Sequence, residues 1–432
     1  MNKWIHIGCG KLGLGLIKDI VSNFNCESIF INRRSEKEYY SKLKEQKGHY
    51  FISFPDSTQK ELYINFHYYG EEIVRDYFCD KELLFISTSV GINNFTDISN
   101  YLIDMLYERF TFLGNKGILF IIACENLSKN SEELKRVILR EIANDEINKT
   151  FVNFIKDNVI PLNAIVDRIC SKVNVENDKV IVYAEKFYQW KVDIFKSRDF
   201  FPKFNEIFNS YINLIGLSDP REYEFHEKMK YWLLNGAHLA IAIKAYIMNL
   251  HNENTLATLP EAVISSDIQK EIALIINASK TALKYQSKET MNNIISSEEI
   301  DKYADAILER IRNGPPDAIE RILKDILQLE KIDEQIKDLL NKIEENKNNK
   351  DEIKNEIKVF LNIFNITAYI NKILERLIEP FEYFCKSIEM IQSKAALNLI
   401  KPTFEAIIDL IKQSYALQAH LFEMVEEKIA HI

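Results

Sequence analysis

The first 200 residues alternate short apolar runs with segments that have one polar and one apolar face. The apolar runs are rich in Ile, Leu and Phe and do not alternate with polar residues, which is typical of parallel strands covered on both faces. Amphipathic stretches near 12–23 and 95–109 predict helices between them. This βαβ pattern predicts a doubly wound α/β domain of the Rossmann type. The predicted strands are 3–8, 28–32, 83–88 and 117–123, with one or two more within 179–194.

From about residue 200 the apolar positions follow a helical period instead. The segment NGPPDA at 313–318 ends one helix and starts another, because its two prolines cannot continue a helix. This part of the chain is therefore expected to be mostly α-helical. The predicted helices lie near 203–215, 222–250, 267–285 and 298–312.

The C-terminal part has helical patterns without any recognisable motif. Apolar residues from Ile322 to Ile343 follow a loose heptad spacing, which predicts a coiled-coil-like helix. The charged segment ENKNNKDE at 345–352 predicts an exposed turn, and three more amphipathic helices fit in 353–375, 378–396 and 402–431. These helices complete a substrate domain, form an oligomer interface or recruit a partner, and we favour the first. The predicted domains are 1–200 (Rossmann-type), 201–330 (helical, substrate-binding) and 331–432 (helical extension).

Composition and charge narrow the class of protein. Hydrophobic residues make up 47% of the 432 residues and charged residues 28%, which is ordinary for a globular protein. The net charge of -9 argues against nucleic acid as a partner, and no apolar run approaches the roughly 20 residues that span a membrane. The chain opens on MNKWIHIGCG, which enters a strand at once and is unlike a signal peptide, so we expect a cytoplasmic protein. The six cysteines include no CxxC pair, so neither a disulfide framework nor a zinc site is expected.

The segment GCGKLG at 8–13 directly follows the first predicted strand and opens a helix. Its glycines fit the GxGxxG pattern, in which one glycine permits a tight turn, the next permits close approach of a pyrophosphate, and the third packs helix on strand. The helix N-terminus then offers amide donors and a favourable dipole to the phosphates. The alternative is a glycine-rich turn without a ligand. The predicted cofactor-binding residues here are Gly8, Gly10, Lys11, Leu12 and Gly13.

The second predicted strand ends in Asn32, Arg33 and Arg34. An NAD site usually has an acidic residue at this point to hold the ribose hydroxyls, and Asn32 cannot supply that charge. Two arginines can instead bind a 2′-phosphate through charge and bidentate hydrogen bonds. These three residues are therefore predicted to contact the cofactor, with NADP preferred over NAD. The alternative is that both arginines are simply solvated on a surface loop.

The segment KYWLLNGAH at 230–238 brings polar groups into an apolar helix. At about 100° per residue, Glu227, Asn235 and His238 fall about 60°, 140° and 80° from Lys230, so all four share one helix face. A lysine in a dry pocket can exchange protons near neutral pH, and an Asn can donate a hydrogen bond to a carbonyl or alkoxide oxygen. Spacing alone leaves a second interpretation equally open, in which Glu227 and Lys230 are exposed and the histidine is an ordinary core residue.

The chain resembles the polyol-specific long-chain dehydrogenases, the family of mannitol dehydrogenase and mannitol-1-phosphate 5-dehydrogenase. The signature Lys-x4-Asn-x2-His of that family is present as Lys230, Asn235 and His238, and IHIGCGKLGLGLI is similar to the opening of the mannitol-1-phosphate branch. The resemblance extends over residues 1 to about 315. Four further blocks agree in order: STSVG at 87–91, IIACENL at 121–127, AIVDRI at 164–169 and AEKFYQWKVD at 184–193.

The resemblance implies an NAD(P)-dependent, metal-independent oxidoreductase that interconverts a polyol or polyol phosphate and its ketose. Lys230 would be the general acid/base, Asn126 and Asn235 would stabilise the oxyanion, and Glu227 would relay the proton. His238 and Asp167 would hold the substrate, and Arg310 is a less secure match to a family arginine. Ser87 and Thr88 of STSVG would contact the cofactor.

The sequence also departs from the family pattern. Lys11 and Leu14 replace the Asn and Arg usual in the glycine loop, and IERILKDILQL stands where the basic segment RxPLRKL is expected. These departures support an alternative function, a cofactor-binding regulatory or interaction protein that acts through its C-terminal helices, with self-association as one outcome.

Overall fold

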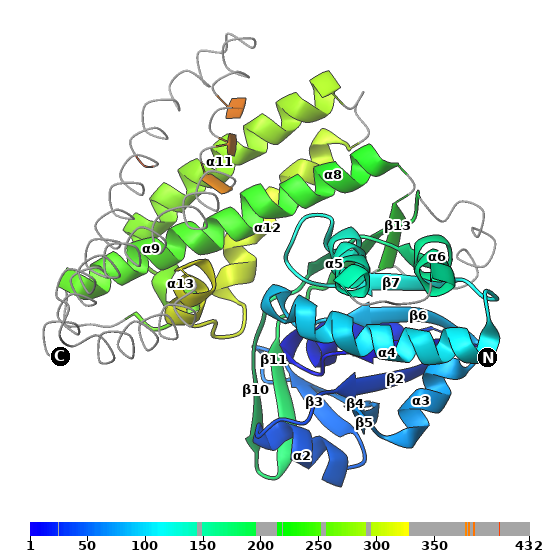
Figure 1. Cartoon of the computed structure of the whole chain (residues 1–432). Coiled ribbons are helices and arrows are strands. Elements are labelled where there is room, and N and C mark those ends of the chain that lie inside the picture. The colour runs from blue at the N-terminus through cyan, green and yellow to red at the C-terminus, as the bar shows by residue number, and fades with distance from the viewer. Residues whose placement is uncertain are drawn as a thin grey trace, which may run out of the picture. The chain divides into compact units, whose positions relative to one another are not determined.

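The structure is a computed structural model, and the chain divides into two compact units, residues 1–227 and 228–432 (Figure 1). The boundary lies further along the chain than the predicted one at residue 200. Residues 214–217 form a strand of the first unit, β13 (Leu214–Leu217), where the apolar pattern predicts the end of a helix. The described residues are 1–24, 26–144, 149–195, 214–217, 219–251, 256–290, 295–327, 376–377, 379–380, 383–384 and 406.

The first unit is built on a six-stranded sheet in the order β5-β2-β1-β6-β7-β8, with every neighbouring pair parallel. This order is that of the doubly wound dinucleotide-binding fold, and it reverses direction between β1 and β6. The four predicted strands are confirmed, whereas the short edge strands β5 and β8 were not predicted. The bounds are β1 (Lys3–Ile7), β2 (Glu27–Asn32), β5 (Asn65–Tyr68), β6 (Leu83–Thr88), β7 (Leu119–Ala123) and β8 (Val159–Pro161).

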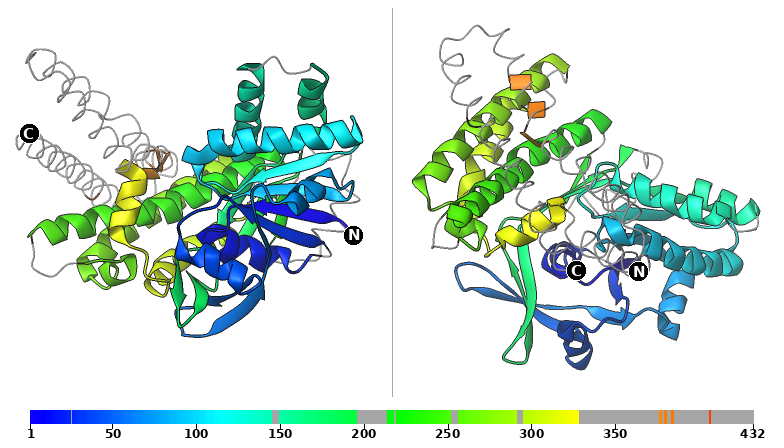
Figure 2. Two further views of the ribbon diagram at one scale, coloured as in Figure 1. Left: turned by 60° about the horizontal axis from the view of Figure 1, so that its bottom comes forward. Right: turned by 60° about the vertical axis from the view of Figure 1, so that its left-hand side comes forward.

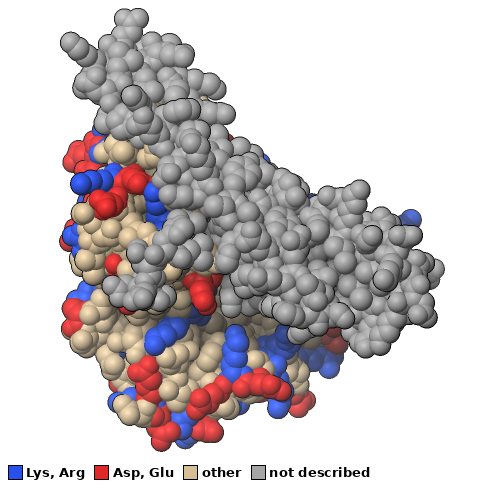
Figure 3. All heavy atoms as spheres, turned by 90° about the vertical axis from the view of Figure 1, so that its left-hand side faces the viewer, with Lys and Arg blue, Asp and Glu red and all other residues tan. Residues whose placement is uncertain are grey.

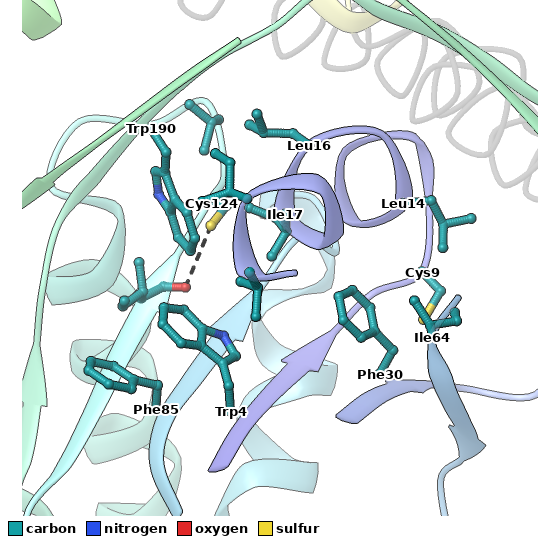
Figure 4. Packing of buried hydrophobic residues seen from close by; sticks show 14 of the residues in the cluster. Trp4, Cys9, Leu14, Leu16, Ile17, Phe30, Ile64, Phe85, Cys124 and Trp190 are labelled. Atoms are coloured by element: carbon teal, nitrogen blue, oxygen red, sulfur yellow. Dashed lines mark hydrogen bonds between the residues drawn. The ribbon is translucent and has the colours of Figure 1, made fainter. Parts of the chain in front are cut away.

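Both faces of this sheet are covered, so alternate residues of one strand enter different cores. Ile5 and Ile7 of β1 belong to a core that includes apolar residues of four helices. Trp4 belongs to the opposite core, where its ring lies 4.5 Å from that of Phe85 and 5.6 Å from that of Trp190 (Figure 4). The four helices of the first core are α3 (Glu72–Cys79), α4 (Phe95–Leu113), α5 (Asn130–Asn144) and α6 (Lys149–Asn158).

Two smaller sheets extend the first unit. One is four-stranded, with the order β10-β11-β3-β4. It consists of the hairpins β3–β4 (blue in Figure 2) and β10–β11 (green), which are joined because β11 pairs in parallel with β3. The third sheet, β13-β12-β9, has Trp190 of β12 opposite Val166 of β9. The bounds are β3 (His49–Ser53), β4 (Gln59–Tyr63), β9 (Ala164–Asp167), β10 (Cys170–Glu176), β11 (Lys179–Ala184) and β12 (Gln189–Asp193).

The remaining helices of the first unit are short, and the last of them crosses the unit boundary. The helix after the glycine segment begins with a π-helical turn, η1, before it becomes α-helical. These elements are η1 (Gly13–Ile17), α1 (Lys18–Val21), α2 (Glu38–Glu45), the 3-10 turn η2 (Ile92–Asn94) and α8 (Pro220–Met229).

A buried ion pair joins the helix after the glycine segment to the third sheet. Arg168 follows β9, and its guanidinium donates to the carboxylate of Asp19 at 2.7 Å and to the Gly15 carbonyl at 2.5 Å. The side chains of Arg168 and Asp19 are 0% and 1% exposed. The guanidinium also lies 4.8 Å from the centre of the Tyr188 ring. Because water does not screen this pair, its geometry holds the two elements in fixed positions.

The described part of the second unit is helical, as predicted. The helix predicted over 222–250 is present as α8, a π-helical turn and α9, and the NGPPDA segment separates two helices. The predicted heptad helix is described only to Leu327, and the helices predicted from 353 onward lie almost wholly outside the described residues. The bounds are η4 (Lys230–Asn235), α9 (Gly236–His251), α10 (Leu259–Ala262), α11 (Ser266–Thr290), α12 (Ser297–Arg312) and α13 (Ile319–Leu327).

Hydropathy and surface charge bear on the predictions about membranes and nucleic acids. Among the described helices, none has the length and apolar character needed to cross a membrane. On the face drawn in Figure 3, Lys and Arg are interspersed with Asp and Glu over the described surface. The described part of that face therefore lacks the extended basic patch typical of nucleic-acid binding.

Arg168→Ala should lower the free energy of unfolding by up to about 3–5 kcal/mol, because it leaves the buried carboxylate of Asp19 with only the partly exposed Lys60 as an ion-pair partner among the described residues. Urea denaturation of the full chain measures this change. Arg136→Ala is the control, since Arg136 pairs with Glu133 on the surface and its loss should leave the urea midpoint nearly unchanged. Equal effects of the two substitutions would contradict the structural role of the buried pair.

Candidate functional site

The glycine segment forms a tight turn at the end of β1, and each glycine meets a different constraint. Gly8 has a φ of 105°, and a Cβ there would lie 2.6 Å from the Ser89 carbonyl oxygen. A Cβ at Gly13 would lie 2.1 Å from the Gly8 carbonyl oxygen, so only glycine permits this packing of helix on strand. A Cβ at Gly10 would have no atom of a more distant described residue within 4 Å. This combination fits the approach of a ligand's pyrophosphate at Gly10.

Buried hydrogen bonds between side chains of β1 and β6 support the glycine turn. The Trp4 indole donates to the Ser87 hydroxyl at 2.7 Å, and that hydroxyl lies 2.7 Å from Nδ1 of His6. Because the Gly8 carbonyl oxygen, 3.1 Å from Nε2 of His6, can only accept, Nε2 carries the proton, and Nδ1 accepts from the Ser87 hydroxyl. Burial lowers the pKa of His6 to about 3, so the ring is neutral. Ser87, predicted to contact the cofactor, is thus fully buried beneath the turn.

Asn32 holds the other side of the turn. Its side-chain oxygen accepts from the backbone N–H of Cys9 at 3.1 Å, and its amide donates to the Arg33 carbonyl at 2.7 Å. The side chain therefore fixes the glycine turn against the end of β2, a role that does not need the negative charge of an acidic residue.

The two arginines that follow have different surroundings. Arg33 pairs with Asp97 at 3.1 Å, with both side chains about two-thirds exposed. The Arg34 guanidinium lies 5.2 Å from the centre of the Tyr68 ring. Both arginines directly follow the end of β2, where a doubly wound fold places a cofactor's ribose.

The CEN segment lies in the loop after β7, at the carboxyl end of the sheet. The carboxylate of Glu125 accepts from the Thr88 hydroxyl at 3.2 Å and from the Val90 backbone N–H at 2.9 Å. Burial raises the pKa of this carboxyl, while these two hydrogen bonds act in the opposite direction. The neighbouring Asn126 is exposed. Asn130 fixes the loop, since its amide donates to the carbonyls of Glu125 and Ala164.

The third sheet carries a buried polar group that sequence reasoning did not single out. Lys191 of β12 and His226 of α8 are each 4% exposed, with Nζ lying 2.6 Å from Nδ1 of the histidine. Burial and the lysine's charge lower the pKa of His226 to about 3, so it accepts this hydrogen bond as a neutral ring. Asp167 is also 4% exposed and lies on the same face, because β9 and β12 pair Ile165 with Lys191.

Glu227 is linked to the loop after β7. Its carboxylate accepts from the Ser128 hydroxyl at 2.7 Å and from the Tyr223 hydroxyl at 3.5 Å. Ser128 follows Asn126 by two residues, so one hydrogen bond connects two of the segments predicted to form the site.

The helix that carries the predicted catalytic lysine is π-helical over Lys230–Asn235. In a π-helix the hydrogen bonds run from residue i to i+5, so Lys230 and Asn235 lie one turn apart on one face. The α-helical period used for the prediction set them about 140° apart. His238 follows Asn235 by three residues in α9 and lies on the adjacent turn. Asn235 is 8% exposed, and Lys230 and His238 are partly buried.

His238 lies among charged groups of the second unit. Burial lowers the pKa of His238 to about 4, the carboxylate of Asp317 raises it, and Arg310, Arg321 and Arg376 lower it further. Asp317 is 3% exposed and accepts two hydrogen bonds from Arg321, one of them 2.7 Å long. The predicted Arg310 therefore acts electrostatically on His238, as do Arg321 and Arg376, which were not predicted.

The predicted site residues fall into the two units. The first unit brings together the glycine turn, Asn32, Arg33, Arg34, Ser87 and Thr88, and holds Asn126, Asp167 and Glu227. The second unit holds Lys230, Asn235, His238 and Arg310. Within the described residues, no group of three or more His, Cys, Asp or Glu could hold a metal ion.

The residues that sequence reasoning missed carried only weak signals. His6 and Lys191 each interrupt an apolar strand, and a polar residue inside such a strand needs a buried partner. The identity of that partner depends on strand order and register, which the sequence pattern does not reveal.

Comparison with known proteins agrees with this architecture. Residues 2–206 match the family model of the mannitol dehydrogenase Rossmann domain. A mannitol-1-phosphate 5-dehydrogenase of Clostridium acetobutylicum is 28% identical over 315 residues, covering 72% of this chain and 73% of the relative. One of Thermoanaerobacter pseudethanolicus is 25% identical over 318 residues, covering 73% of each chain. The predicted family resemblance is thereby confirmed, and the family is one of oxidoreductases.

Two solved structures share the fold at low sequence identity. Substrate-free D-sorbitol dehydrogenase has a TM-score of 0.57 at 14% identity, covering 78% of this chain and 76% of that one. Mannitol 2-dehydrogenase of Pseudomonas fluorescens, solved with NAD and D-mannitol, has a TM-score of 0.55 at 13% identity and covers 94% of both chains.

Gly10→Ala should leave the melting temperature nearly unchanged and weaken dinucleotide binding by at least tenfold, because an added methyl group occupies only the space that a pyrophosphate would use. Calorimetric titration with NADH and NADPH measures the binding. Gly13→Ala is the contrasting variant, since its methyl group would clash with backbone and should lower the melting temperature. Normal nucleotide binding by Gly10→Ala would show that the turn is not a phosphate site.

Proposed function

We propose that this chain, whose residues 2–206 match the mannitol dehydrogenase Rossmann domain, interconverts a polyol or polyol phosphate and its ketose with NAD(P). The observation that carries the proposal is the glycine turn after β1, where the strand order of the sheet reverses. A side chain would clash with backbone at Gly8 and Gly13, whereas the space beside Gly10 is free for a ligand. The substrate class is suggested by the relatives, which are mannitol-1-phosphate 5-dehydrogenases. We expect the protein to act on small molecules in the cytoplasm.

The residues of the first unit fit a dinucleotide. The backbone of residues 8–13 and the start of the following helix would hold the pyrophosphate, and the rim at Arg33 and Arg34 would hold the adenosine ribose. When bound, the nicotinamide supplies or accepts the hydride. The network of Trp4, Ser87 and His6 keeps the turn in the conformation that this binding needs.

The proton chemistry falls to the helix of the second unit. Lys230 would take the proton from the reacting hydroxyl in oxidation and return it in reduction, as a general acid/base. Asn235, one π-turn away, would donate a hydrogen bond to the oxygen as its negative charge develops, and Asn126 would donate a second. Such bonds lower the barrier because they strengthen as that charge appears.

Glu227 offers a route for the proton to leave. Its carboxylate already accepts a hydrogen bond from Ser128, an exposed residue of the loop after β7. A carboxylate with an exposed partner can pass a proton to water. Asp167, beside the buried Lys191 and His226, would bind a substrate hydroxyl.

The C-terminal extension has contacts that favour a part in the substrate domain over a separate interaction module. Tyr383 packs on Trp232 of η4, with ring centres 5.4 Å apart. The Arg376 guanidinium lies 5.9 Å from the centre of the Tyr231 ring. These contacts of Tyr383 and Arg376 with η4, the turn that begins at Lys230, support that part of the proposal. Self-association of the chain stays a prediction.

Lys230→Met should lower kcat by about 10²–10⁴-fold with every ketose that the wild-type protein reduces, because the general acid is lost. The assay follows NADH and NADPH oxidation with fructose, fructose 6-phosphate and fructuronate. Lys302→Met, on the exposed surface of α12, is the matched control and should retain wild-type turnover. If the kcat of Lys230→Met equals that of Lys302→Met, Lys230 is not the general acid/base.

Arg33→Ala should raise the KM for NADPH by about tenfold and leave the KM for NADH within about twofold, because the guanidinium is proposed to pair with the 2′-phosphate. Loss of the exposed pair with Asp97 should have little effect on folding. If the wild-type protein prefers NADH and Arg33→Ala changes neither KM, both arginines are instead solvated residues of a surface loop.

A further inference from the structure

An acidic residue lies close to the end of β2, although it comes from a different segment. Asp97 lies in the first turn of α4, and its carboxylate accepts a hydrogen bond from the Arg33 guanidinium at 3.1 Å. Arg33 directly follows β2, whereas α4 follows β6 through η2, and β2 and β6 are the two neighbours of β1. The ion pair therefore joins the segments that follow the two strands flanking β1, the strand that ends in the glycine turn.

Other contacts hold these segments together without the ion pair. The Tyr69 backbone N–H donates to the Asn32 carbonyl at 3.0 Å. The Tyr69 ring stacks on that of Tyr101 in α4, with ring centres 3.9 Å apart and planes 4° apart. Ile31 of β2 and Leu102 of α4 also belong to one core. Because packing fixes α4 beside the end of β2, loss of the ion pair should remove a charge interaction without moving the helix.

Both members of the ion pair are accessible to a ligand. The side chains of Arg33 and Asp97 are 68% and 66% exposed. Asn32, by contrast, is bound to the backbone of the glycine turn and carries no charge. An adenosine ribose at the end of β2 would therefore meet a guanidinium and a carboxylate that already bind each other.

The two nucleotides would affect this ion pair in opposite ways. NADH leaves the pair intact, and its ribose hydroxyls can donate to a carboxylate, as they do to the acidic residue of an ordinary NAD site. The 2′-phosphate of NADPH carries a charge of about −1.5 to −2. It competes with the carboxylate for the guanidinium, and the carboxylate also repels it.

We propose that Asp97 is a specificity-determining residue that limits the preference for NADPH over NADH. This inference rests on the proposed function and deepens it, because Arg33 alone would favour the phosphorylated nucleotide. Asp97 holds the Arg33 guanidinium when NADH is bound, whereas NADPH binds with the guanidinium turned to its 2′-phosphate. The ion pair thus reduces the difference between the affinities for the two nucleotides.

The test is the ratio of dissociation constants, Kd for NADH over Kd for NADPH, measured by calorimetric titration of the full chain. In Asp97→Asn this ratio should rise about three- to tenfold, because the guanidinium is released and the repulsion of the 2′-phosphate is lost. Asp104→Asn is the matched control, since Asp104 is exposed about two turns further along the same α4. Its ratio should stay at the wild-type value.

Further measurements distinguish this role from a structural one. The rise in the ratio should shrink at high salt, because salt screens exposed charges. It should also shrink when Asp97→Asn is combined with Arg33→Ala, since no guanidinium is then left for the carboxylate to hold. Asp97→Ser removes the same charge and should raise the ratio equally, and the melting temperatures of both Asp97 variants should stay close to that of the wild-type protein.

The outcomes separate this inference from the proposed reaction. If both nucleotides bind and the ratio rises but no ketose is reduced, the proposed reaction fails while the role of Asp97 stands. An unchanged or lower ratio in folded Asp97→Asn would overturn the role of Asp97 and leave the proposed reaction intact. Absence of binding by either nucleotide would contradict both.

Discussion

The buried ion pair between Asp19 and Arg168 is the interaction on which the first unit depends. It ties the helix after the glycine turn to the end of β9, and its two side chains are almost completely shielded from water. If the two elements shifted apart, the Arg168 guanidinium would lose its carboxylate partner, and Asp19 would keep only the partly exposed Lys60 among the described residues, so such a shift costs free energy. Asp167 directly precedes Arg168, and the pair therefore fixes a predicted substrate residue relative to the glycine turn.

Both helices that carry the proposed chemistry contain a π-helical turn. One is η1, which follows the glycine turn, and the other is η4, which begins at Lys230. A π-turn is less stable than an α-turn and is found often at functional sites, where it changes which side chains share a face. In η4 the change sets Lys230 and Asn235 one turn apart, closer in angle than the about 140° of an α-helix, as a shared oxygen atom would require.

The sequence predicts the four central strands, most of the helices and the residues of the glycine turn. These features depend on local pattern, such as apolar runs, helical period and glycine spacing. It does not predict the two smaller sheets, because pairing such as that of β11 with β3 joins residues far apart in the chain. Periodicity also cannot reveal a π-turn, since a single turn does not alter the apolar stripe enough. Within the candidate site, the motif Lys-x4-Asn-x2-His is readable from spacing, but the partners of its residues are not.

Those partners depend on packing between distant segments. The hydrogen bond from Lys191 to His226 and the approach of Arg376 to Gly236 are both of this kind. The contacts of Arg376 were not predicted, because the extension carries no recognisable motif and its helical pattern gives no indication of what it packs against.

The most direct test of the proposed reaction is isotope transfer from NADH or NADPH deuterated at C4 of the nicotinamide, with fructose 6-phosphate as acceptor and mass spectrometry of the product. We predict a polyol phosphate with one deuterium on the carbon that was the carbonyl. Nucleotide binding without any deuterated product, from either nucleotide and with fructose and fructuronate as well, would contradict it.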